Sequence, residues 1–234
     1  MDDAEVFAYV EKHLSKVQRP EFYPLLPKDS GPEGSPAFFR RVCELTFPAV
    51  ADYLGAGTLE PPEIFCPDDS GFDSLAGIIS KDAGIQKRSA KRRLERTADP
   101  ATITFASREP AIWSGYFRPQ SQRFYRDAAP EECAHYSHLM LAHSAIGNEN
   151  EIFIEGLASG VVSEIGSLLP EYLDVSRRET ARQIQAIYDL KMAETLPETI
   201  EFDNRVFGRA WYALATLGMG SPEKREFLGR VARL

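Results

Sequence analysis

The sequence predicts an α+β fold, in which a helical N-terminal part is followed by a small antiparallel sheet and then by a helix-rich C-terminal part. Apolar residues recur at helical spacing over residues 3–17, over residues 36–54 and again from residue 130 onward. Between these segments, Thr102–Ala106 and its neighbours are rich in β-branched and aromatic residues. Strands that are grouped between helices, rather than alternating with them, are typical of the α+β class.

The composition is that of an ordinary globular chain large enough to bury its own core. The chain has 234 residues, 43% of them hydrophobic, and a net charge of −8. This acidic balance argues against nucleic acid as a partner. The three cysteines are widely spaced and odd in number, so neither a disulfide framework nor a zinc ribbon is indicated. An acidic N-terminus and the lack of a long apolar run predict a cytoplasmic protein without a membrane span.

The N-terminal part is expected to hold two helices. The first covers residues 3–17, and a turn-rich loop follows it at residues 28–36. The second covers residues 36–54, where Pro48 is expected to kink or split the helix. Its apolar stripe consists of Phe39, Val42, Leu45, Val50 and Leu54. We interpret residues 1–60 as an N-terminal helical extension and residues 61–234 as the main domain, or both as one continuous domain.

The middle of the chain carries weaker signals. A short strand is expected at Glu63–Cys66, and further strands at residues 102–106, 112–117 and 122–126. The remainder of residues 61–82 gives no clear pattern. The basic run Lys87–Arg96 is interpreted as an exposed helix end or loop, whose charges are solvated rather than bound to nucleic acid.

Helical periodicity then continues to the end of the chain. The expected helices cover residues 130–146, 151–168, 175–195, 203–217 and 222–233.

A possible metal site lies in the first two of these helices. Glu131 and His135 are four residues apart and therefore project from the same face of a helix, one turn apart. Glu155 follows His135 after 19 intervening residues, which is enough for the first helix to end and a second one to return alongside. Such a helical hairpin predicts that Glu131, His135 and Glu155 converge on one metal ion.

These residues resemble those of gluzincin metallopeptidases, which carry HExxH on one helix and a glutamate ligand on the next. Here the motif reads Glu131-Glu132-Cys133-Ala134-His135, with glutamate in place of the first histidine. Further similarity extends over about half of the chain, at residues 114–117, 122–125, 136–139, 154–158 and 207–220.

The resemblance implies a zincin-like domain of the minigluzincin type. It implies that Glu131, His135 and Glu155 bind zinc, or the harder ions iron or manganese, and that Glu132 is the general base. It also suggests Tyr212 as a residue that stabilises the transition state. In such proteins an edge hairpin precedes the active helix, so the strand ending near Tyr125 is expected to border the cleft.

The departures from the family pattern point to a change of function. Two carboxylates in the ligand set make the metal a weaker Lewis acid, so its bound water is harder to deprotonate. Ser159 stands where the family often has an aspartate that supports a histidine ligand. We therefore expect a metallopeptidase-like pseudoenzyme with weakened or lost hydrolase activity, which binds a peptide or protein in the cleft that was the active site of an ancestral peptidase. An active metal-dependent peptide hydrolase is the first alternative, and a di-iron carboxylate protein is a second.

The same residues also agree with purely structural roles at helix starts or in the core. Pro130, Glu131 and Glu132 together are also an ordinary helix start, since proline fits the first turn and carboxylates favour the positive end of the helix dipole. Glu155 could likewise be a carboxylate in the first turn of its own helix. We expect Cys133 to be a small core residue. Of the remaining histidines, we expect His138 to be a packed or supporting residue, and His13 and His143 to have no role.

Overall fold

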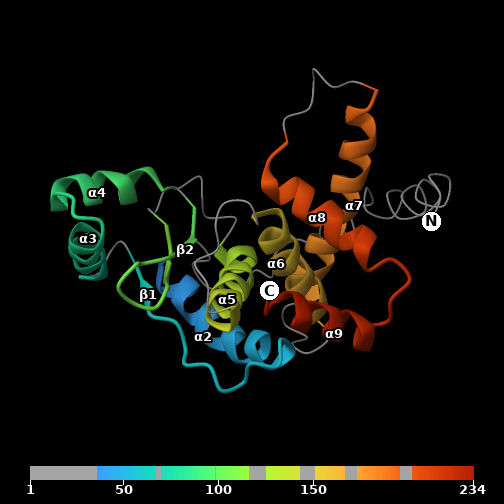
Figure 1. The fold of residues 1–234 in the computed structure, drawn as a ribbon, viewed down its shortest axis with the longest axis horizontal. Coiled ribbons are helices and arrows are strands. Elements are labelled where there is room, and N and C mark those ends of the chain that lie inside the picture. Colours follow the sequence, from blue (N-terminus) through green and yellow to red (C-terminus); the bar gives the residue numbers. More distant parts are fainter. Residues whose placement is uncertain are drawn as a thin grey trace. The chain divides into compact units, whose positions relative to one another are not determined.

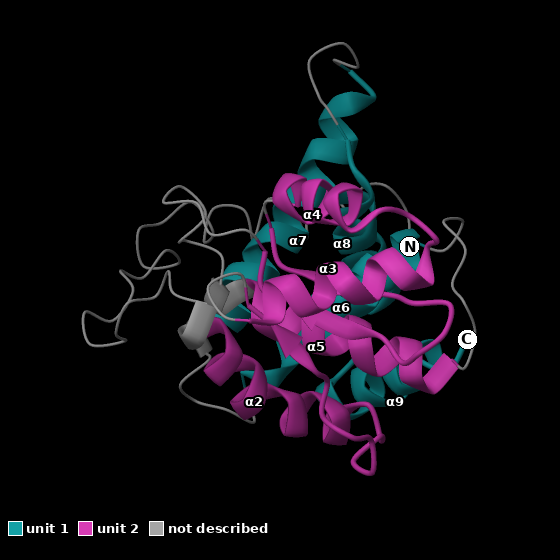
Figure 2. Cartoon of the chain, turned by 90° about the vertical axis from the view of Figure 1, so that its left-hand side faces the viewer, with its two compact units in different colours: residues 1–26, 145–234 teal, residues 27–144 magenta. Residues whose placement is uncertain are grey.

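The computed structural model describes residues 36–66, 70–97, 99–115, 125–142, 151–166, 173–195 and 202–234. The helix expected over residues 3–17, together with His13 and His143, lies outside them. Within the described residues the chain forms eight helices and one three-stranded sheet (Figure 1), which confirms the α+β class. Two compact units are coloured separately in Figure 2. We call residues 27–144 the mixed unit, and residues 1–26 with 145–234 the helical unit.

Among the described residues, the strands of the mixed unit's sheet are shorter than predicted, and the sheet is mixed rather than wholly antiparallel. Its strands are β1 (Ile64–Phe65), β2 (Ala101–Ile103) and β3 (Ala111–Trp113), in the order β1-β3-β2. β2 pairs with β3 in antiparallel register, whereas β1 pairs with β3 in parallel. The parallel pair arises because two helices and β2 lie between β1 and β3 in the sequence, which gives the chain room for a crossover.

One face of the sheet is covered by α3 (Gly71–Asp82) and α4 (Lys87–Arg96). Ala111 and Trp113, two residues apart on β3, point to this face, because side chains alternate along a strand. Trp113 is fully buried, and its ring lies 5.8 Å from that of Phe72. The residues of this core are Phe65, Leu75, Ala76, Ile79, Ala90, Leu94, Ala111 and Trp113.

The basic run predicted as a helix end or loop is a complete helix, α4. Ala90 and Leu94 lie one turn apart and bury one side of it, while most of its basic residues are exposed. Lys91 pairs with Asp73 of α3 at 2.5 Å. Burial by a few apolar residues thus orders a helix whose composition is otherwise that of a solvated segment.

The other face of the sheet meets α5 (Tyr125–Ala142), which packs in turn against α2 (Pro36–Tyr53). Thr102 of β2 and its cross-strand partner Ile112 lie on this face, and the Thr102 hydroxyl donates to Glu132 of α5. Phe47 and Tyr136 form an edge-to-face pair between the two helices, with ring centroids 5.8 Å apart.

The stripe predicted for α2 is buried except at Leu45, whose side chain is 55% exposed. Phe47, four residues after Cys43, is buried there instead. Pro48 lies inside α2, as predicted, and the helix continues through it to Tyr53.

The strand predicted over residues 122–126 is wrong for the part that the structure describes. Tyr125 and Arg126 belong to α5, whereas residues 122–124 lie outside the described residues. The expectation that a strand ends near Tyr125 beside the site is therefore also wrong. Pro130, expected at the helix start, lies inside α5, five residues after its first residue.

The described part of the helical unit consists of α6 (Glu151–Ile165), α7 (Leu173–Ala193), α8 (Asn204–Ala215) and α9 (Ser221–Val231). These bounds agree with the predicted helices to within three residues at each end. The closest packing is between α6 and α8, where Gly156 and Gly208 face each other. A Cβ atom at Gly208 would lie 2.7 Å from backbone atoms of α6, so this crossing accepts only glycine without adjustment.

The remaining helices pack around this pair. α7 contacts both α6 and α8, and Ala186, Ile187, Ala210 and Ala213 form the core between α7 and α8. α9 contacts α6, where Lys224 pairs with Glu164 at 3.0 Å. Among the described residues, no helix has the length and apolar character needed to cross a membrane.

Candidate metal centre

The mixed unit positions Glu131 and His135 through the packing of α5. Cys133, Ala134 and Tyr136 are buried in the core of this unit. Burial of these side chains fixes the rotation of α5 about its axis. Glu131 and His135 are half-buried and lie one turn apart, as predicted from their spacing.

The helix-start interpretation of these carboxylates does not agree with the observed bounds of α5. The helix begins at Tyr125, so Glu131 and Glu132 lie in its second turn rather than in its first. The difference exceeds the one or two residues by which helix ends are uncertain. Similarly, α6 begins at Glu151, so Glu155 lies one turn after the first-turn acidic residue. Attraction to the helix dipole, which falls off beyond the first turn, does not explain these three carboxylates.

Glu132, the residue expected to act as the general base, is 7% exposed. Its Oε2 atom accepts a hydrogen bond from the Thr102 hydroxyl at 2.7 Å, and its backbone carbonyl lies 3.1 Å from the same hydroxyl. One threonine on β2 thus orients both the backbone and the carboxylate of Glu132. One of the two carboxylate oxygens of Glu132 is therefore held by the sheet.

The helical unit positions Glu155 at the crossing of α6 and α8. Its Cβ atom lies above Gly208, and its Oε2 atom is 3.9 Å from Nε of Arg205. Burial raises the pKa of the Glu155 carboxyl above its usual value, and the charges of Arg205 and Arg209 partly oppose that shift. A buried carboxylate that carries a desolvation penalty gains more from a bound cation than an exposed one does.

The three predicted ligands form a group in the structure. One carboxylate oxygen of Glu131, one imidazole nitrogen of His135 and one carboxylate oxygen of Glu155 lie within 4.8 Å of one another. The structure thus contains a possible metal-binding cluster of two carboxylates and one imidazole.

The other residues singled out in the sequence have different environments. His138 is 6% exposed and lies outside this group, as its position two turns from Glu131 predicts. Cys133 is fully buried and donates to the Cys43 carbonyl at 3.8 Å, which agrees with its prediction as a core residue. Tyr212 is 1% exposed, and its ring fills the space above Gly160. A role of Tyr212 in transition-state stabilisation stays a prediction.

A buried polar network that the sequence did not predict lies one turn from Glu155. Ser159, one turn after Glu155, donates to Oε1 of Glu179 at 2.8 Å. Glu179 lies on α7 with 3% of its side chain exposed, and it also binds Nε of Arg209 at 2.7 Å. Gln183 donates to both the hydroxyl and the carbonyl of Ser159. The position where the family pattern has an aspartate thus carries a hydroxyl joined to a carboxylate on the next helix.

Comparisons with protein-family models, with curated proteins and with solved structures found no match to this chain. The resemblance to gluzincins therefore stays a prediction that rests on the residues described above.

Proposed function

We propose that Glu131, His135 and Glu155 bind one divalent metal ion in a metallopeptidase-like protein with weakened or lost hydrolase activity. The same surface would then serve to bind a peptide or protein. The single observation that supports the proposal is the group of three ligand atoms within 4.8 Å. These residues come from two separate helices and include the histidine and the two glutamates expected from the spacing.

The chemistry of the ligand set favours an ion that accepts both oxygen and nitrogen. Two carboxylates and one imidazole suit zinc, and also iron or manganese, which take more oxygen ligands. The two negative charges are half-buried, so a divalent cation would neutralise them where solvation is incomplete. A fourth position is left for water or for a carbonyl oxygen of a bound peptide.

Two features support weak rather than efficient hydrolysis. A second carboxylate in place of a histidine lowers the Lewis acidity of the ion. The carboxylate of Glu132 is also held by Thr102, so it is a constrained base. An ion in this site would therefore polarise a bound carbonyl less than in an active peptidase.

The proposal is tested by metal analysis of protein purified without chelator and by zinc titration of the apoprotein. We expect one equivalent of metal in the wild type and a loss of binding in His135→Ala. His138→Ala is the matched control, because it removes an imidazole from the same helix outside the group. Failure of the wild type to bind any divalent metal, or equal loss in the two variants, would show that the ligand set is wrong.

A second variant tests the role of the glutamate at position 131. Glu131→His recreates the usual pair of imidazoles one turn apart, so zinc affinity should rise. Peptidase activity assayed in parallel separates the two functional hypotheses. Measurable zinc-dependent hydrolysis by the wild type would favour the active peptide hydrolase. Appearance of activity only in Glu131→His would support a binding protein derived from an enzyme.

A further inference from the structure

The basic helix of the mixed unit, α4, carries a row of arginines on the side that faces away from the core. Arg88, Arg92 and Arg96 follow one another at intervals of four residues, and all three are exposed. Each of them is two residues from Ala90 or Leu94, which α4 buries. Two residues correspond to about 200° of rotation around a helix, so the arginines lie opposite the buried side. We call Arg88, Arg92 and Arg96 the arginine stripe.

The packing of α4 fixes the direction in which the stripe points. Ala90 and Leu94 are 0% and 3% exposed and belong to the core beneath the helix. On the side next to α3 (Figure 1), Lys91 pairs with Asp73, and its Nζ atom lies 5.9 Å from the centroid of the Phe72 ring. These contacts prevent α4 from turning about its axis. The helix therefore presents the stripe along about 12 Å of its length.

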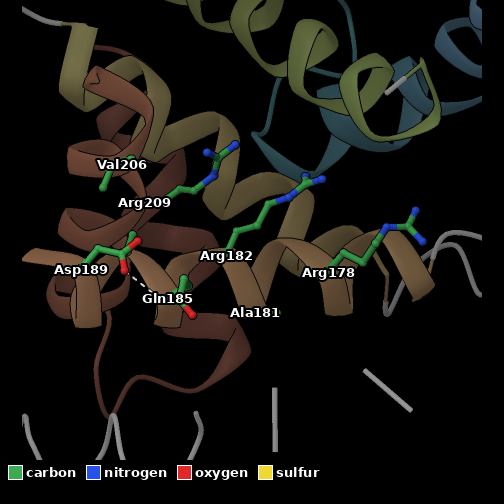
Figure 3. A pocket seen from close by; sticks show the side chains of 8 residues that line it. Arg178, Ala181, Arg182, Gln185, Asp189, Val206 and Arg209 are labelled. Atoms are coloured by element: carbon green, nitrogen blue, oxygen red, sulfur yellow. Dashed lines mark hydrogen bonds between the residues drawn. The ribbon is translucent and has the colours of Figure 1, made fainter. Parts of the chain in front are cut away.

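The positive charge of the stripe is not neutralised by the fold. Among the residues that the structure describes, its guanidinium groups have no ion-pair or hydrogen-bond partner, and Glu95, the one acidic residue of α4, forms no ion pair with them. The arginines of the helical unit have a different environment. Figure 3 shows Arg182 and Arg209 beside the pocket between α7 and α8, and both pair with the buried carboxylate of Glu179.

The charge pattern of α4 disfavours the helix that carries it. Successive arginines of the stripe are like charges one turn apart, which destabilise a helix. Lys87 and Arg88 occupy the first turn, where positive charge opposes the helix dipole. Within this helix, which is described throughout, the first turn contains no acidic residue and Gln86 forms no side-chain cap. An anionic partner would relieve both kinds of repulsion, so the stripe gains from a ligand what it costs the free protein.

We propose that the arginine stripe binds an acidic segment of a partner protein. A planar guanidinium group can form two parallel hydrogen bonds with one carboxylate. Residues four apart in a helix are separated by about 6 Å along its axis, and alternate residues of an extended chain by about 6.7 Å. Carboxylates at either spacing match the interval between the arginines. The stripe lies wholly in the mixed unit, and the proposal does not rest on the proposed metal ion.

Two observations favour an acidic protein segment over other polyanions. The chain has a net charge of −8, which repels a long polyanion such as nucleic acid, whereas a short segment needs to approach only the stripe. The two apolar residues of α4, Ala90 and Leu94, face the core of the mixed unit. This helix therefore has no apolar side to insert into a lipid surface, as interfacial helices do.

Fluorescence anisotropy with a labelled acidic peptide tests the proposal, in the presence of EDTA so that the proposed metal ion takes no part. The probe is an alanine-based peptide with blocked ends and a glutamate at every fourth position. We expect one site per chain, an affinity that falls as salt is added, and no binding when glutamine replaces the glutamates. Arg92→Glu should weaken binding by about tenfold or more, because it opposes like charges in the contact.

Arg93→Glu is the matched control. Arg93 is the exposed neighbour of Arg92, so the change of charge is the same, but its side chain leaves α4 about 100° away from that of Arg92. This variant should weaken binding by less than about threefold, as expected for an exposed charge beside the contact.

Thermal unfolding of the free proteins separates recognition from a structural role. Arg92→Glu replaces two like-charge pairs by two opposite pairs, which outweighs its new repulsion from Glu95, so its melting temperature should equal or exceed that of the wild type. A clearly lower value would contradict the absence of a partner for Arg92. The proposal is overturned if the wild type shows no saturable binding, or if Arg93→Glu weakens binding as much as Arg92→Glu. It is also overturned if a single-stranded oligonucleotide of equal charge, or vesicles containing phosphatidylserine, bind as tightly as the peptide.

Discussion

The close crossing of α6 and α8 makes a quantitative prediction for Gly208→Ala. An added Cβ atom would lie 2.7 Å from the Gly156 nitrogen, from the Ile152 carbonyl oxygen and from Cβ of Glu155. Favourable contacts between carbon atoms lie at about 3.5–4.0 Å, so the two helices would have to separate by nearly an ångström. Two of the three obstacles are backbone atoms, which cannot rotate out of the way.

The expected free-energy change is the balance of two effects. Overpacking of a close contact costs about 1–3 kcal/mol. Alanine is favoured over glycine within a helix by about 1 kcal/mol, which offsets part of that cost. We therefore expect Gly208→Ala to lower the free energy of unfolding by about 0–2 kcal/mol.

Gly77→Ala is the matched control for this measurement. Gly77 lies inside α3, and a Cβ atom there would meet nothing within 4 Å. Only the helix preference of alanine remains, so this variant should be more stable than the wild type by about 0.5–1 kcal/mol. Urea unfolding followed by far-ultraviolet circular dichroism measures both changes. A Gly208→Ala protein as stable as Gly77→Ala would refute the close approach of α6 and α8.

Two further predictions concern the mixed unit. Hydrogen bonds from the Ser107 hydroxyl and from backbone N–H groups lower the pKa of Asp82 below its usual 3.8. Asp82 therefore stabilises the folded state above pH 3.8, and this contribution is lost as the pH falls through the lowered value. Asp82→Asn should reduce the melting temperature at pH 7, and the difference from the wild type should shrink as the pH falls below 3.8. All three thiols are buried, and burial raises the pKa of Cys43; the thiols are those of Cys43, Cys66 and Cys133. A thiol-specific reagent should therefore react with none of them in the native protein and with all three in guanidinium chloride. Fast reaction of any one thiol under native conditions would contradict this burial.

The helices with long apolar periodicity were predictable from the sequence, whereas elements ordered by only a few contacts were not. The helices after residue 150 lie close to their predicted bounds because their core-facing residues repeat over several turns. α3 was missed although Phe72, Leu75, Ala76 and Ile79 have helical spacing, because the preceding Ser70-Gly71 pair and Gly77 are typical of turns. α4 becomes recognisable as a helix only when Ala90 and Leu94 have a core to enter.

The candidate ligand set could be predicted because i, i+4 spacing and an adjacent helix are properties of the sequence. The start of α5 could not, since Pro130 is a strong signal for a first turn and here the helix continues through it. The Glu179 network depends on how α7 packs against α6 and α8, and nothing in the spacing of its residues reveals that tertiary packing. Long-range packing, rather than local propensity, decided each of these cases.

The order in which the two units occur in the chain has a consequence for biosynthesis. Every described element of the mixed unit, from α2 to α5, precedes the first residue of α6. Glu131 and His135 therefore leave the ribosome before Glu155 does. Because domains fold as units during synthesis, α5 can be ordered at that stage with two of the three proposed ligands. Stable metal acquisition would then be delayed until α6 and α8 have left the ribosome and packed together.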